Sequence, residues 1–201
     1  MITEDDIDYV FQNLEERRDI EFKQAINWNT SDGVKACITK DMMAFSNIKT
    51  GGYLVIGVRQ NSNHSFTPVG ITLEVYDSHN LDSVLPYINS KAEPPVNVEL
   101  RKFVRDGMRF VIYKIYPFEN YPVFCKNEDN ASTQLHRGVI YTRTTRMYES
   151  APIQNQTEMN EIKEMILDRS IEEYTRRTQQ MSRVNTTSDE QQFDSEIEGL
   201  P

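Results

Sequence analysis

The chain has 201 residues with a hydrophobic fraction of 38%, a size that predicts one well-packed domain with tails rather than two full domains. No apolar run approaches the roughly 18 residues that span a bilayer, and the acidic start lacks the basic-then-apolar order of a signal peptide. We therefore expect a cytoplasmic protein with no membrane partner. Two distant cysteines, Cys37 and Cys125, argue against a disulfide framework and against a cysteine zinc site.

The charge is unevenly distributed. A net charge of −9 disfavours a nucleic-acid partner for the chain as a whole, because phosphate binding relies on Lys and Arg. However, residues 1–16 carry six acids and no base, and residues 185–201 carry five acids and no base. The rest of the chain holds all 22 basic residues against 20 acids. A locally basic surface is therefore compatible with the composition.

The first predicted elements are a helix and a strand. Residues 3–16 place apolar side chains at helical spacing behind Thr3, a favourable N-cap, with acids in the first turn. Residues 19–25 then alternate, with Ile20 and Phe22 directed inward and Glu21 and Lys23 outward. Glu21 and Lys23 are therefore expected to share one face of a strand.

The remaining elements alternate between helical and extended patterns. Glycines 51 and 52 permit the turn into an apolar strand, residues 105–107 form a hairpin signal, and Pro86 is a site for a kink. The expected order is a helix at 31–47, a strand at 53–58, a helix at 77–91, hairpin strands at 93–104 and 108–117, a further strand pair at 121–126 and 134–144 around a polar loop, and a helix from Asn155 to about Arg177.

These elements predict an α+β domain with a mixed, largely antiparallel sheet flanked by helices. We place this domain at residues 1–178. Residues 179–201 have few apolar residues, and from residue 185 on they lack positive charge, so we expect a disordered acidic tail.

Two groups of residues are candidates for function. Basic residues interleave with aromatic ones on the last strand pair, where guanidinium groups could hold phosphates and rings could stack on unpaired bases; the ordinary solvated face of a sheet is the alternative. This group comprises Lys126, Arg137, Tyr141, Arg143 and Arg146.

The second group is the stretch "EERRDIEFK", residues 15–23. Glu16 at the end of a helix and Glu21 on a strand could converge on Mg²⁺ or Mn²⁺, and Lys23 could stabilise charge that develops during phosphodiester cleavage. The same spacing is also common in solvated helix ends. No dinucleotide fingerprint or Walker loop is present, and the three histidines lack metal-ligand spacing, so neither ATP nor zinc is expected.

The succession "EERRDIEFK", "MMAFSNIKTGGYLVIGV", "VIYKIYPFENYPVFCK" and "GVIYTRTTRMYESAPIQNQTEMNEI" resembles the Schlafen AlbA-type domain over roughly residues 9–170. The resemblance implies nucleic-acid binding and, as in several Schlafens, metal-dependent endoribonuclease action on tRNA and rRNA. It also implies a site of two glutamates, matched by Glu16 and Glu21, and an aspartate. Arg59 and Gln60 stand where that aspartate is expected. Either another acid substitutes, with Asp19 or Asp77 as candidates, or this chain binds without cutting.

Longer Schlafens pair two such lobes in one chain, so a single lobe is expected to form its groove as a homodimer. The first hypothesis is a protein that binds structured RNA such as tRNA, in preference to DNA, with divalent-metal endoribonuclease activity as its extension. The alternative is an inactive interaction module that binds a protein partner or DNA.

Overall fold

The structure is a computed structural model. It describes residues 1–12, 14–128 and 134–197, with side chains described up to residue 180. The chain divides into two compact units, Met1–Ile162 and Lys163–Pro201. The first contains every strand and the candidate site. No described helix is long and apolar enough to cross a membrane.

A four-stranded sheet forms the centre of the first unit. The order of its strands is β1 (Ile20–Lys23), β2 (Gly52–Ile56), β7 (Met108–Ile115) and β6 (Val98–Arg105). Strand β1 runs parallel to β2, and the other neighbours are antiparallel, so the predicted α+β class with a mixed, largely antiparallel sheet is confirmed. The predicted hairpin is present, and its turn places Asp106 and Gly107 at positive φ, as in a two-residue turn that matches the twist of the strands.

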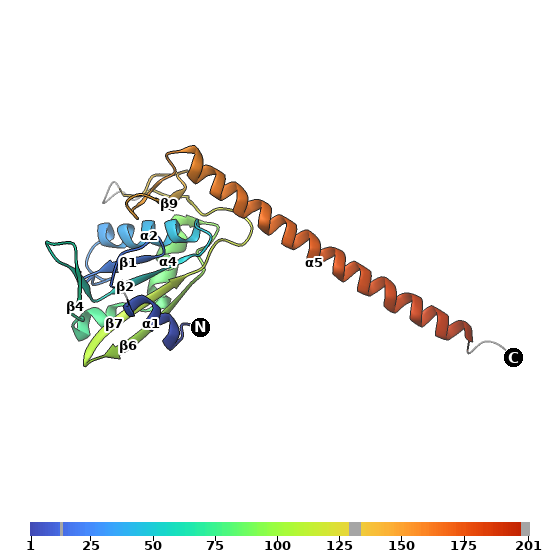
Figure 1. The fold of residues 1–201 in the computed structure, drawn as a ribbon, viewed down its shortest axis with the longest axis horizontal. Helices are drawn as coiled ribbons and strands as arrows, with labels where there is room; N and C mark the ends of the chain where they lie inside the picture. The colour runs from blue at the N-terminus through green and yellow to red at the C-terminus, as the bar shows by residue number, and fades with distance from the viewer. Residues whose placement is uncertain (13, 129–133, 198–201) are drawn as a thin grey trace. The chain divides into compact units, whose positions relative to one another are not determined.

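Helices cover both faces of this sheet. Helix α1 (Glu4–Gln12) packs Ile7 and Val10 against one face, in a core shared with Ile20 and Phe22. Helix α2 (Asp32–Ser46) lies on the other face, and Figure 1 shows the sheet between the two. Because side chains of a strand alternate between faces, Glu21 and Lys23 point toward α2. The two side chains share one face, as expected, but that face is covered by protein rather than open to solvent.

Close approach between α2 and β2 depends on a glycine. A Cβ built on Gly52 would lie 2.1 Å from Cδ1 of Phe45. Because Gly52 has no Cβ, the helix and the sheet pack at a distance that no larger residue at position 52 allows.

Helix α2 begins after Ser31, whose hydroxyl accepts a hydrogen bond from the Val34 amide.

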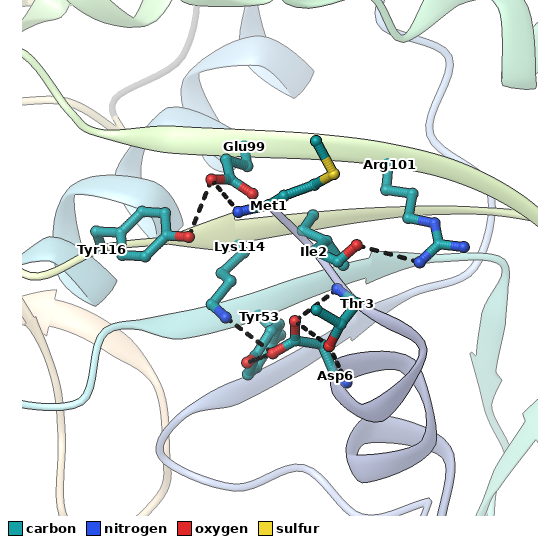
Figure 2. A network of polar contacts seen from close by, with 9 residues as sticks. All are labelled: Met1, Ile2, Thr3, Asp6, Tyr53, Glu99, Arg101, Lys114 and Tyr116. Carbon is teal, nitrogen blue, oxygen red and sulfur yellow. Dashed lines mark hydrogen bonds and ion pairs between the residues drawn. The ribbon is translucent and has the colours of Figure 1, made fainter.

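Polar contacts hold the N-terminal helix on the sheet (Figure 2). Thr3 caps α1 as predicted, since its hydroxyl accepts from the Asp6 amide while the Asp6 carboxylate accepts from Thr3. The same carboxylate accepts from Lys114 Nζ and Tyr53 Oη, at 2.8 and 2.5 Å. Although burial alone would raise it, these donors hold the pKa of Asp6 well below its usual value. The N-terminal amine also donates to Glu99.

Three short strand pairs surround the main sheet. They are β3 (Val58–Gln60) with β4 (Phe66–Pro68), β5 (Ala92–Glu93) with β8 (Phe124–Cys125), and β9 (Tyr141–Arg143) with β10 (Ser150–Pro152). The expectation that 121–126 pairs with 134–144 was wrong as to partners. Among the described residues, the backbone hydrogen bonds between these two segments are limited to those that Cys125 makes with Gly138 and Val139. Part of the polar loop between these strands, residues 129–133, lies outside the described residues.

The remaining helices also differ from expectation. The single helix expected at 77–91 is two helices, α3 (Leu73–Ser78) and α4 (Leu81–Lys91, with Pro86 inside), because Asn80 caps a new helix through the Asp82 amide. Helix α5 (Gln156–Ile197) begins where predicted, after Asn155, whose side-chain oxygen accepts a hydrogen bond from the Glu158 amide, while the Glu158 carboxylate accepts from the Gln154 amide. It also covers most of the tail that was expected to be disordered. Residues 179–197 contain no Gly or Pro to end a helix, and residues 198–201 lie outside the described residues.

Candidate functional site

Glu21 and Lys23 lie in the layer between the sheet and α2. Their side chains are 12% and 22% exposed. Strand alternation puts both on the α2 face, and the segment around β9 closes over them, since Arg143 of β9 contacts Glu21. The two charges of "EFK" therefore lie in a largely desolvated space, where ionic interactions are stronger than in water.

Both oxygens of the Glu21 carboxylate are paired with a cation of the protein. Oε1 lies 2.5 Å from Lys23 Nζ, and Oε2 lies 2.9 Å from NH1 of Arg143. A buried carboxylate is stable only when its charge is compensated. Here Lys23 and Arg143 compensate the charge of Glu21, so no external ion is required.

Asp41 of α2 is the functional candidate that the sequence analysis missed. Its Oδ2 atom lies 3.3 Å from Lys23 Nζ, its side chain is 5% exposed, and Oδ2 makes no hydrogen bond. Burial alone would lower the pKa of Lys23, but Asp41 and then Glu21 outweigh it and raise that pKa. Lys23 therefore stays charged at neutral pH. The sequence signal that could have indicated a buried acid was the position of Asp41 directly before the apolar residues 42–45 of the predicted helix.

Glu16 completes the cluster from a different element than expected. Helix α1 ends at Gln12, so Glu16 belongs to the connection before β1 and not to a helix end. Burial, and after it the charge of Glu21, raise the pKa of Glu16, while the Phe22 amide, Lys23 and Arg143 partly offset the rise. Glu16, Glu21 and Lys23 are thus close enough to interact, and their catalytic role stays a prediction.

Arg143 and Tyr141 do not lie where a nucleic acid could contact them, so those two expectations are corrected. Each is 1% exposed. The Arg143 guanidinium also donates to Ser150 Oγ and to the carbonyl oxygens of Arg17 and Arg18, and it lies 4.8 Å from the ring centre of Phe45. Alternation along β9 alone could not reveal that α2 and the segment before β1 cover the Arg143 side chain.

Tyr141 has a comparable internal role. Its hydroxyl accepts from the His136 amide and donates to the Gln134 carbonyl. The ring is therefore a support for the loop before β9 rather than a stacking platform.

The other basic candidates are accessible. Arg137 and Arg146 are exposed, and neither forms an ion pair within the described part of the chain. Lys126 is partly exposed and lies 3.3 Å from Glu93. A cleft of about 530 Å³ opens beside Arg146, and its lining includes hydroxyl and amide side chains, such as Thr144 and Asn155, together with two acids, Glu149 and Glu158. The segment from Gln134 to Tyr148 contains three arginines and no acid.

The residues present do not fit a divalent metal. No group of three or more Asp, Glu, His or Cys side chains in the described residues is arranged to hold one. The two substitutes considered for the missing acid are elsewhere: Asp19 accepts from Tyr9 Oη at 2.6 Å, and Asp77 is exposed at the end of α3. The nearest additional acid is Asp41, which is paired with Lys23.

The fold and site together define an α+β domain in which β9 contributes Arg143 to a buried cluster of carboxylates and cations, while the segments before and after β9 carry the exposed Arg137 and Arg146. Residues 16–152 match the family described as Schlafen, AlbA_2, so the chain belongs to this family. The match contains Glu16, Glu21, Lys23, Asp41 and Arg143. The membership supports nucleic-acid binding as the class of function.

Two solved structures align with part of this chain and are distant from it in sequence. The DIP2311 protein from Corynebacterium diphtheriae aligns with a TM-score of 0.44 and 11% identity, over 72% of this chain and 23% of that one. The N-terminal domain of a RecG-related protein from Nitrosomonas europaea aligns with a TM-score of 0.41 and 20% identity, over 65% of this chain and 84% of that one. This chain therefore spans less than a quarter of the Corynebacterium protein. A search of curated proteins gave no match.

Proposed function

We propose that this protein binds structured RNA, such as tRNA, through the basic segment that flanks β9. The observation that carries the proposal is the exposure of Arg137 and Arg146, neither of them ion-paired within the described residues, in a stretch without a single acid. Guanidinium groups free of carboxylate partners can hold phosphate oxygens in bidentate fashion. The polar cleft beside Arg146 offers hydroxyl and amide groups for further contacts, alongside two acids, Glu149 and Glu158.

The choice of RNA over DNA and a homodimeric groove are parts of this proposal and rest on the family resemblance. Action in the cytoplasm is a further part and rests on the composition of the sequence. Divalent-metal cleavage is not included. Because Lys23 and Arg143 already neutralise Glu21, the cluster is better suited to holding β1, α2 and β9 together than to recruiting Mg²⁺ or Mn²⁺. When end-labelled tRNA is incubated with the protein and Mn²⁺, the tRNA should therefore bind to the protein but should not be cleaved.

Fluorescence anisotropy with labelled tRNA at several salt concentrations tests the binding. Affinity should fall steeply with salt, because phosphate contacts release counterions. The double variant Arg137→Glu/Arg146→Glu should bind at least about tenfold more weakly, and its salt dependence should be shallower by about two in the logarithmic slope, roughly one per lost contact.

The matched control is Arg59→Glu/Arg109→Glu, which makes the same charge change at two exposed arginines, of β3 and β7, that form no ion pair within the described residues; it should bind nearly as well as wild type. Equal loss in both double variants would mean that only overall charge matters. Absence of tRNA binding at low salt would reject the proposal and favour the alternative of a module that binds a protein partner or DNA. A gel shift with duplex DNA of similar length would then separate these two.

A further inference from the structure

We infer that the ammonium group of Lys23 occupies the cation position of the carboxylate cluster, between Glu21 and Asp41, so that this chain does not bind a divalent metal at Glu21. The inference deepens the proposed function, on which it rests for its relevance to RNA, by making RNA binding independent of metal. Its structural basis is the set of contacts among Glu21, Lys23 and Asp41.

The position of Lys23 is that of a ligated cation. Its Nζ atom lies between carboxylates from two elements, 2.5 Å from Glu21 of the same strand and 3.3 Å from Asp41 of α2. A Mg²⁺ or Mn²⁺ ion would need oxygens of the same two groups at about 2.0–2.2 Å. An ion there and the ammonium group would compete for one space and repel each other.

The charges of the cluster lead to the same conclusion. Three carboxylates, Glu16, Glu21 and Asp41, face two cations, Lys23 and Arg143. Formally the cluster carries −1, and a divalent ion would convert it to +1 in a space with little water. Without Lys23 the formal charge would be −2, which a divalent ion would neutralise.

The two cations of the cluster are not equivalent. Arg143 is buried and held by Ser150 and two backbone carbonyls in addition to Glu21, so it cannot leave without breaking several hydrogen bonds. Among the described residues, Lys23 Nζ contacts only carboxylates, and the side chain is 22% exposed. Lys23 is therefore the group whose removal should open the site to a metal.

The test is a titration with Mn²⁺ alone, followed by electron paramagnetic resonance of the free ion, on wild type and Lys23→Met. Wild type is expected to show no binding that depends on Glu21, so Glu21→Gln should give an identical curve. Lys23→Met should gain a site at least about tenfold tighter than any wild-type binding. That gain should disappear in Lys23→Met/Asp41→Asn, because Asp41 would supply one of the ligands.

Wild-type Mn²⁺ binding that is lost in Glu21→Gln would overturn the inference. So would a folded Lys23→Met variant, verified by circular dichroism, that gains no site. Should Lys23→Met not fold, the wild-type and Glu21→Gln titrations decide alone. Anisotropy with labelled tRNA, measured in EDTA and in Mn²⁺, separates the two proposals. If the Mn²⁺ titrations come out as expected but the protein does not bind tRNA, only the proposed function is rejected. If tRNA binding requires Mn²⁺ and is lost in Glu21→Gln, this inference is rejected.

Discussion

Replacing Arg143 by methionine should lower the free energy of unfolding of the domain by about 3–5 kcal/mol, the usual cost of removing one partner from a buried ion pair. The side chain is 1% exposed. Its loss leaves Glu21 Oε2 without its partner at 2.9 Å. It also leaves the carbonyl oxygens of Arg17 and Arg18 and the hydroxyl of Ser150 without this donor.

Urea denaturation followed by circular dichroism measures the effect, and a thermal melt should show a decrease in midpoint of roughly 6–20 °C for a domain of this size. Arg146→Met, three residues further along and exposed, is the matched control and should change stability by less than about 0.5 kcal/mol. In the double variant Arg143→Met/Glu21→Gln the losses should be less than additive by at least about 1 kcal/mol. An Arg143→Met variant within about 1 kcal/mol of wild type, or as stable as Arg146→Met, would refute the assignment of Arg143 to the buried cluster.

Two further substitutions test how the helices are held on the sheet. Asp6→Asn should cost about 1–3 kcal/mol, because Lys114 and Tyr53 lose a charged acceptor. The folded-state pKa of Asp6 lies below the ordinary 3.8, so its contribution to stability is complete above about pH 4 and is lost as the pH falls through the folded-state pKa. The urea midpoints of wild type and Asp6→Asn should therefore converge in acid. A difference in midpoint that stays constant with pH would contradict this. Gly52→Ala should cost about 1–3 kcal/mol in the same assay, because its Cβ would lie 2.1 Å from the Phe45 ring; a neutral effect would show that α2 can shift.

Local chemistry made much of the domain predictable. Thr3 as a helix cap, the alternation of "DIEFK" and the turn signal of "RDG" each involve residues within a few positions of one another, and each predicted element is present. The order of these motifs along the chain was also enough to indicate the Schlafen AlbA-type family, and the match over residues 16–152 confirms it.

The short outer strands and the candidate site were less predictable, because their partners are remote in sequence. Strand β8 contains only two residues, and its sequence carries no information on whether β5 or the segment before β9 will pair with it. Likewise, period-two alternation assigns Glu21 and Lys23 to one face but cannot say whether water or a helix covers that face.

By itself, therefore, the sequence determined the fold class, the helices and strands of the main sheet region, and three members of the cluster, Glu16, Glu21 and Lys23. Only the tertiary structure decided that Arg143 is buried on Glu21 while Arg146 remains exposed, and that Asp41 rather than Asp19 or Asp77 meets Lys23. The physical reason is that ionic contacts and burial depend on which surfaces α2 and β9 bring together. Those surfaces come from segments far apart along the chain, and no local pattern encodes their packing.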